Sequence, residues 1–110
     1  MNEQEIKKEI QNMVQMIVAQ YQPEKIILFG SYAWGKPDRT SDVDFFIVKD
    51  TALRQIDRSI VVRRILPQDR TVGVDLIVYN PQELRQAVSK QNVFIKKVLG
   101  EGKELYDRTR

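Results

Sequence analysis

Two aspartates near the middle of the chain, Asp42 and Asp44, are spaced to act together on a divalent metal ion. They stand at the start of VDFFIV (43–48), whose β-branched and aromatic residues predict a strand. Side chains two residues apart on a strand point to the same face, which puts the carboxylates roughly 6–7 Å apart. A cation between them would relieve their repulsion, and their hard oxygens favour Mg²⁺ or Mn²⁺ over zinc. The structural alternative is that Ser41 and Asp42 form a turn and Asp44 is an exposed strand residue.

A third aspartate, Asp75, interrupts the apolar run TVGVDLIVY (71–79), which predicts another strand. A carboxylate inside a core strand needs a partner, because unpaired burial is costly. A metal shared with Asp42 and Asp44 would provide one. The alternative is a salt bridge to one of three arginines that precede the strand, Arg63, Arg64 or Arg70.

Gly30 and Ser31 have the pattern of a phosphate-binding turn. They follow the short apolar run KIILF (25–29), which predicts a buried strand, and they should open a short helix. Backbone N–H groups, the positive end of a helix and a hydroxyl would then meet where phosphate oxygens bind, and a glycine lets a ligand approach the backbone. Taken alone, Gly-Ser after a strand is more often an ordinary tight turn.

Composition restricts the chemistry further. The 110 residues include no Cys and no His, which excludes disulfides, thiolate nucleophiles, histidine-ligated zinc and an imidazole base. Acid–base or metal chemistry must therefore use carboxylates. A phosphate-binding turn combined with three acids fits two-metal phosphoryl transfer, in which metal ions bridge nucleophile, phosphate and leaving group.

The elements that must position these residues can be read from periodicity and turn signals. Apolar residues at helical spacing predict a helix over 3–21, capped by Asn2 with Glu5 and stopped by Pro23. A helical crossover is expected before Pro67, with an apolar face made of Leu53, Ile56, Ile60 and Val61.

Further along the chain, Asn80, Pro81 and Glu83 form the capping box of another helix. A last helix is expected around 93–99 and a short edge strand over 104–107. The prediction is an α+β fold: one domain over 1–110, with a single mixed sheet and helices packed on it.

The net charge of +3 is concentrated in residues 49–72. The six basic side chains there, against three acids, could form a docking face for phosphates or an acidic partner, with Arg54 and Arg58 one turn apart at its centre. The alternative is a solvated helix face. The excess is too small to indicate a nucleic-acid-binding protein.

At this point the sequence resembles the nucleotidyltransferase superfamily that includes DNA polymerase beta, most closely its minimal nucleotidyltransferase (MNT) branch. The family pattern is Gly-Ser, about ten residues, Asp-x-Asp, and a third Asp in a later strand. Gly30, Ser31, Asp42, Asp44 and Asp75 match it. The resemblance also covers 33–35, Asn80 to Leu84 and the tail 102–106, and it implies the polymerase beta palm-like fold.

The resemblance implies roles for the matched residues. Gly30 and Ser31 would hold the triphosphate of ATP, Asp42 and Asp44 would bind two Mg²⁺ ions, and Asp75 would complete one metal site and help deprotonate the acceptor. One departure is Trp34, where the branch often has Arg. The missing cation could come from Lys36, Arg39 or a partner, and Trp34 could stack on a base or pack within its short helix.

The implied function is antitoxin activity: transfer of AMP from ATP to a hydroxyl, a tyrosine, of a HEPN ribonuclease toxin. We expect a hetero-oligomer with that toxin, with a homodimer as the other arrangement, and no binding to nucleic acid. A 110-residue chain has little surface to define an acceptor, which favours a partner that supplies it. The alternatives are an inactive antitoxin that works by binding alone and a stand-alone enzyme acting on a small molecule.

The sequence also predicts a cytoplasmic location. The start MNEQEIKKEI has no hydrophobic signal core, and no apolar run approaches the ~20 residues that a membrane span needs.

Overall fold

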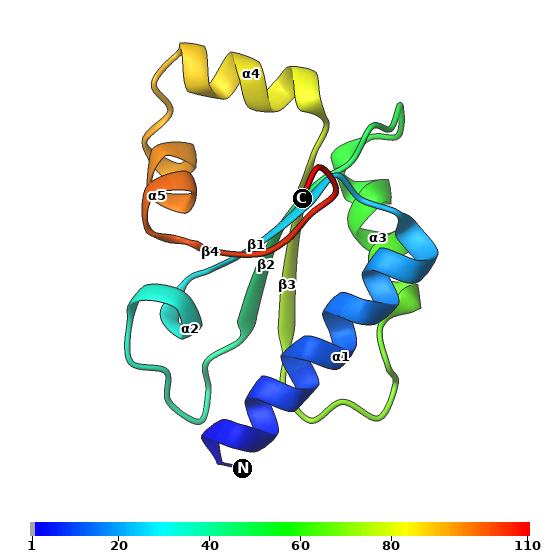
Figure 1. The fold of residues 1–110 in the computed structure, drawn as a ribbon, viewed down its shortest axis with the longest axis vertical. Coiled ribbons are helices and arrows are strands. Elements are labelled where there is room, and N and C mark those ends of the chain that lie inside the picture. Colours follow the sequence, from blue (N-terminus) through cyan, green and yellow to red (C-terminus); the bar gives the residue numbers. More distant parts are fainter. Residues whose placement is uncertain (1) are drawn as a thin grey trace.

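A computed structural model describes residues 2–110 (Figure 1). Its helices are α1 (Glu3–Tyr21), α2 (Ser31–Trp34), α3 (Gln55–Ile65), α4 (Pro81–Ser89) and α5 (Val93–Glu101). Its strands are β1 (Lys25–Phe29), β2 (Val43–Val48), β3 (Val74–Tyr79) and β4 (Lys103–Asp107). The predicted α+β class with one mixed sheet is confirmed. Within the described part of the chain, no helix is both long and apolar enough to cross a membrane.

The four strands form one sheet in the order β3-β2-β1-β4. β1 pairs antiparallel with both β2 and β4, and β2 pairs parallel with β3. A parallel pair needs a long crossover, and α3 supplies it. The register of that parallel pair places Asp44 opposite Asp75. Two acids from separate parts of the sequence therefore become neighbours across two strands.

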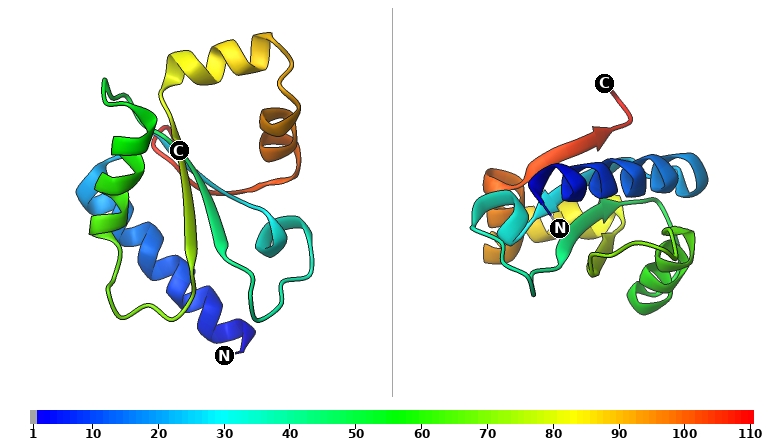
Figure 2. Two further views of the ribbon diagram at one scale, coloured as in Figure 1. Left: turned by 180° about the vertical axis from the view of Figure 1, so that it is seen from behind. Right: turned by 90° about the horizontal axis from the view of Figure 1, so that it is seen from below.

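The sheet separates two groups of helices, as the views in Figures 1 and 2 show. On one face, α1 and α3 cover the strand residues that include Val43, Phe45 and Val74. On the other face, α5 packs on Phe29 and Phe46, next to α2. Because side chains alternate along a strand, Asp44 and Asp75 share the second face with Phe46. The acids and the α1–α3 layer are on opposite sides of the sheet.

The helix ends follow the predicted caps. The Asn2 side chain accepts a hydrogen bond from the Glu5 N–H at 2.9 Å, and α1 ends at Gln22 in the left-handed conformation, one residue before Pro23. At α4 both halves of the capping box form: Asn80 accepts from the Glu83 N–H, and Glu83 accepts from the Asn80 N–H. These caps satisfy amides that a helix start leaves unbonded.

The start of β3 differs from the prediction. The sequence predicts a strand over 71–79, but pairing begins at Val74. The N–H groups of Thr71 and Val72 instead donate to the carboxylate of Glu9 on α1, with the Thr71 N–H at 3.0 Å. Because those amides bond to α1, the first residues of the run stay outside the ladder, and α1 is tied to the loop that leads to Asp75.

The crossover helix α3 also differs from the prediction, because the side of the helix that is buried is not the predicted apolar side. Ile56 and Ile60 are 64% and 43% exposed, whereas Arg58 is only 4% exposed. The Arg58 guanidinium donates to the Leu53 and Val78 carbonyls and forms a 2.6 Å ion pair with Glu83. A docking face centred on Arg54 and Arg58 is therefore wrong, because Arg58 is an internal tie between α3, β3 and α4.

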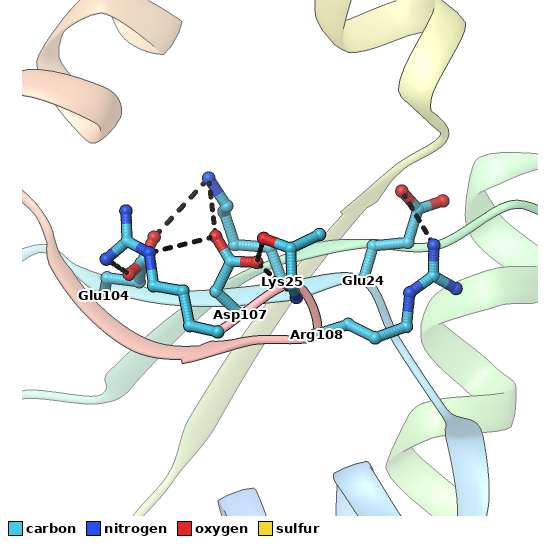
Figure 3. Close-up of polar contacts among 7 residues, drawn as sticks. Glu24, Lys25, Glu104, Asp107 and Arg108 are labelled. Atoms are coloured by element: carbon cyan, nitrogen blue, oxygen red, sulfur yellow. Dashed lines mark hydrogen bonds and ion pairs between the residues drawn. The ribbon is translucent and has the colours of Figure 1, made fainter.

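Strand β4 is held at the sheet edge partly by charge (Figure 3). The Lys25 ammonium lies 3.5 Å from carboxylate oxygens of both Glu104 and Asp107. Hydrogen bonds from Thr109, together with Lys25, lower the pKa of Asp107 to about 2. Charged side chains along an edge strand also discourage its pairing with another chain.

Replacing Arg58 tests its internal role. Arg58→Met keeps most of the aliphatic length but removes the cation paired with Glu83 and the donor to the Leu53 and Val78 carbonyls. We therefore expect a loss of about 2–3 kcal/mol of unfolding free energy. Arg54→Met is the matched control: among the described residues the Arg54 side chain pairs only with Asp57, in an exposed ion pair, so its loss should change stability by less than about 0.5 kcal/mol. Urea unfolding of both variants measures the difference, and equal midpoints would contradict the assignment.

Candidate active site

Gly30 is the turn between β1 and α2, and its conformation is one that only glycine adopts easily. Its φ is 78°, and a Cβ at this position would lie 1.9 Å from Asp44 Oδ2. The absence of a side chain therefore lets the Asp44 carboxylate lie directly against the backbone. From the sequence we expected this glycine to let a ligand approach the backbone. In the structure it is the Asp44 carboxylate that needs the space.

Ser31 begins α2 directly after that glycine. The amides of Ala33 and Trp34 already bond to the Gly30 carbonyl at 3.0 Å. The first two amides of a helix, here those of Ser31 and Tyr32, have no acceptor within it. Together with the serine hydroxyl, they provide donors for phosphate oxygens beside Asp44.

Asp44 and Asp75 form the centre of the acidic group. They are register partners on β2 and β3, and the charge of Asp75 acts on the Asp44 carboxylate. Burial, the charge of Asp75 and then the charge of Asp42 raise the pKa of Asp44 to about 6. The three predicted aspartates therefore interact. The largest cause of the raised pKa of Asp44 is the burial of its carboxylate, and the neighbouring negative charges add to it.

Asp42 lies just before β2, and a second glycine makes room for it. A Cβ at Gly73 would lie 2.2 Å from Asp42 Oδ1, and the Gly73 carbonyl accepts a hydrogen bond from the Val43 N–H. Sequence reasoning missed Gly73. Its position in the sequence could have indicated it, because Gly73 lies two residues before Asp75 just as Asp42 lies two residues before Asp44.

Asp75 is less buried than the sequence indicated. It is exposed, because β3 is an edge strand of the sheet rather than a core strand. It forms no salt bridge to an arginine within residues 2–110, and one of the candidates, Arg63, instead donates to the Val74 carbonyl. Val74 and Asp75 point to opposite faces, which separates the α3 arginines from the carboxylate. The salt-bridge alternative is therefore wrong.

The donor chemistry of this group fits a hard divalent cation. All the side-chain ligands it offers are carboxylate oxygens, the type that Mg²⁺ prefers, and their mutual repulsion at Asp44 is what a cation would remove. Within residues 2–110, however, no three acidic side chains lie close enough together to coordinate a metal ion by themselves. Mg²⁺ typically completes its coordination with water and substrate phosphates rather than with an all-protein cage.

Trp34 packs against the protein beneath it. Its ring centroid lies 6.1 Å from that of Phe29, and the Lys97 ammonium lies 4.8 Å from the Trp34 ring centroid. Lys97, on α5, is a cation beside α2 that the sequence did not point to. The packing role, rather than an open stacking surface, accounts for this residue.

A cavity of about 840 Å³ lies beside Asp42, between the start of α1, the loop 35–42 and the residues before β3. Gly73 and Tyr32 contribute to its wall. Four cations also line it: Lys7, Lys36, Arg39 and Lys103. The two cations that the sequence suggested for phosphate binding, Lys36 and Arg39, therefore lie on the Asp42 side of the acidic group.

The raised pKa of Asp44 has a consequence for stability. A carboxyl group whose pKa is higher in the folded state than in the unfolded chain destabilises the fold as pH rises through the interval from about 4 to about 6. Asp44→Asn should therefore stabilise the metal-free protein by about 1 kcal/mol at pH 8, after allowance for solvent screening. The gain should shrink below about pH 4. Thermal unfolding across this range, with Asp69→Asn as control, measures it; a pH-independent difference would contradict the account.

The tight contact at Gly30 gives a second test. Gly30→Ala combines a left-handed φ with a clash against Asp44, so we expect a loss of about 1–3 kcal/mol. At Gly100 in α5, no atom lies within 4 Å of the position that a Cβ would take, so Gly100→Ala should instead stabilise by about 0.5–1 kcal/mol. Denaturant unfolding compares the two. Similar effects from both substitutions would rule out the close approach.

Comparison with known structures supports the fold. A Sulfolobus solfataricus protein assigned as a nucleotidyltransferase is similar at a TM-score of 0.65 and 23% identity, covering 94% of this chain and 81% of the other. The MntA–HepT toxin–antitoxin structure gives 0.60 and 20%, covering 94% and 74%. At these identities the likeness establishes the fold alone.

A third similar structure is that of the Enterococcus faecialis spectinomycin adenyltransferase with ATP and spectinomycin. It gives a TM-score of 0.62 at 16% identity, with 93% of this chain covered and 56% of that one, so this chain spans little more than half of its length. No curated protein sequence matches the chain significantly.

The family assignment comes from the sequence profile described as "Polymerase beta, Nucleotidyltransferase", which matches residues 8–110. That range contains the Gly30 turn and both strands that carry the acidic pair. The match takes in nearly the whole chain, and its architecture agrees with the observed sheet; the chain belongs to the polymerase beta nucleotidyltransferase family.

Proposed function

We propose that this protein transfers AMP from ATP, with Mg²⁺, to a hydroxyl group of a partner protein, a tyrosine of a HEPN toxin, and so acts as an antitoxin. The observation that carries the proposal is the cross-strand pair of Asp44 and Asp75 next to the Gly30–Ser31 turn. Asp42 stands two residues before Asp44. Carboxylates for metal ions and amides for phosphate oxygens thus lie side by side.

Each residue has a distinct role in the proposed reaction. The free amides of Ser31 and Tyr32, which follow the Gly30 turn, and the Ser31 hydroxyl bind and orient the triphosphate. Asp42 and Asp44 would hold Mg²⁺, which when bound supplies positive charge to the phosphate oxygens and to the leaving pyrophosphate. The acceptor oxygen forms a bond to the α-phosphorus while the bond from that phosphorus to the bridging oxygen breaks. Pyrophosphate leaves, and Asp75 accepts the hydroxyl proton.

The exposure of Asp75 supports a large acceptor. Asp75 lies on an edge strand and is open to solvent, whereas Asp44 is half-buried. A hydroxyl on the surface of another protein can therefore reach Asp75 without entering a closed pocket. The similarity to the MntA–HepT toxin–antitoxin structure supports the same kind of partner.

The decisive experiment is incubation with ATP, Mg²⁺ and a small all-helical protein with an Arg-x₄-His motif, to be sought in the adjacent reading frame. Mass spectrometry should record an increase of about 329 Da, the mass of an added AMP, on a partner tyrosine. Asp42→Asn/Asp44→Asn should abolish it, because both substitutions remove charge that holds the metal ions. Asp50→Asn/Asp69→Asn, two acids outside the site, should leave it intact, and EDTA should stop it.

The rival functions predict different results. An antitoxin that works by binding alone gives no adduct, and the folded Asp42→Asn/Asp44→Asn variant neutralises the partner as well as the unchanged protein does. A stand-alone enzyme transfers AMP to a small hydroxyl compound and leaves the partner unmodified. Either result would replace the proposal.

A further inference from the structure

The outer face of α3 presents apolar and basic residues that no other described part of the fold covers. Ile56 and Ile60 are four residues apart and lie on the same side of the helix, 64% and 43% exposed. Arg63 and Arg64 follow Ile60 by three and four residues, so they continue the same side. We call Ile56, Ile60, Arg63, Arg64 and the nearby Arg70 the α3 outer face.

This exposure follows from what the inner side of the helix does. Arg58 and Val62 are buried against the sheet and α1, and Leu66 closes the helix end. With 3.6 residues per turn, Ile56 and Ile60 must then point outwards. Their helical spacing predicts an apolar face for the crossover, and the structure places that face in solvent.

The arginines of the α3 outer face lie around a pocket of about 350 Å³. Ile60, Gln68 and three arginines line it. Arg63 donates to the Val74 carbonyl at 3.1 Å and Arg70 to the Pro67 carbonyl at 3.0 Å, which fixes their positions while leaving further N–H donors free.

None of these three arginines forms an ion pair with a described residue. Arg54 and Arg58, at the other end of the same helix, are both paired with carboxylates. Asp69, in the turn after α3, does not line the pocket. The outer face therefore offers two exposed isoleucines beside three guanidinium groups that form no ion pair with a described residue.

We propose that the α3 outer face binds an amphipathic, acidic helix of the partner protein. Apolar side chains of that helix would cover Ile56 and Ile60, and its carboxylates would pair with Arg63, Arg64 and Arg70. Arginine suits such bidentate pairing with carboxylates, and interface centres are enriched in it. The identification of the occupant as the partner of the proposed transfer rests on the proposed function; the surface itself does not.

Other occupants fit the surface less well. A second copy of this chain would bring the arginines of one face towards a face that has no carboxylate to pair with them. A nucleic acid would contact the arginines but leave the two isoleucines uncovered, since phosphates carry no apolar surface. Charge and apolar area together favour an acidic helix.

The position of the surface is compatible with catalysis. α3 packs on the sheet face that carries Val74, whereas Asp75 points to the other face. The views in Figure 2 place α3 and α5 on opposite sides of the sheet. A helix docked on α3 would leave the acidic group open to a hydroxyl from elsewhere in the partner.

The test uses a fluorescein-labelled probe peptide of about 18 residues, longer than the roughly 12–15 needed for marginal helicity. Leucines at helical spacing form one side of it and glutamates flank them. Fluorescence anisotropy should detect binding that weakens at least tenfold in Ile56→Ser/Ile60→Ser and in Arg63→Gln/Arg64→Gln. Arg85→Gln/Val88→Ser on exposed α4 is the matched control and should bind unchanged.

Three further arms make the outcome decisive. A peptide with glutamine for every glutamate should lose at least tenfold in affinity and most of its salt dependence. Binding of labelled oligouridylate that depends on the same arginines, or concentration-dependent dimers in sedimentation velocity that Ile56→Ser/Ile60→Ser removes, would overturn the proposal in favour of RNA or a second copy. Equal peptide affinity for all variants would overturn it outright.

Nucleotide binding separates this proposal from the proposed function. Calorimetry with ATP and Mg²⁺ reports on the acidic group and should be unaffected by the α3 variants. If ATP does not bind while the peptide does, the catalytic proposal fails and the docking surface remains. If ATP binds and the α3 variants bind the peptide with unchanged affinity, only the docking proposal is rejected.

Discussion

The parallel pairing of β2 with β3 is the constraint on which the rest of the molecule depends. It sets Asp44 beside Asp75 in register and so concentrates negative charge at one edge of the sheet. Burial and the neighbouring charges raise the pKa of Asp44 to about 6. A cation that enters this acidic group would relieve the repulsion.

Two glycines make this arrangement sterically possible. Gly30 leaves space for the Asp44 carboxylate and Gly73 leaves space for that of Asp42. Each glycine lies where the backbone approaches a carboxylate, one before α2 and one before β3. The acidic group is therefore held by backbone contacts from two separate segments, in addition to its own strand. Such supports are what keep functional groups near one geometry.

The crossover between β2 and β3 carries a second organising interaction. Arg58 joins α3 to the Val78 carbonyl of β3 and to Glu83, which also completes the cap of α4. Hydrogen bonds from Arg58 and Asn80 lower the pKa of Glu83 despite its burial. Because Arg58 takes the inward position, the isoleucines of α3 are turned outwards. One buried cation thus accounts for both the attachment of the crossover and its exposed apolar face.

The sequence by itself determined the local elements and the list of acids. Periodicity and caps predicted α1, β1 and β2 at their observed limits, because helix and strand spacing are local properties. The spacing of Asp42 and Asp44 likewise put them on one face of a strand.

Only the tertiary structure decided that β3 is an edge strand, which exposes Asp75. It also decided that Glu9 on α1 accepts hydrogen bonds from the amides at the start of the 71–79 run. It also decided that Arg58 is buried while Ile56 is exposed. Helical spacing determines which residues share a face but not which face turns inwards, since that depends on acceptors such as the Val78 carbonyl and Glu83, brought there by distant segments of the chain.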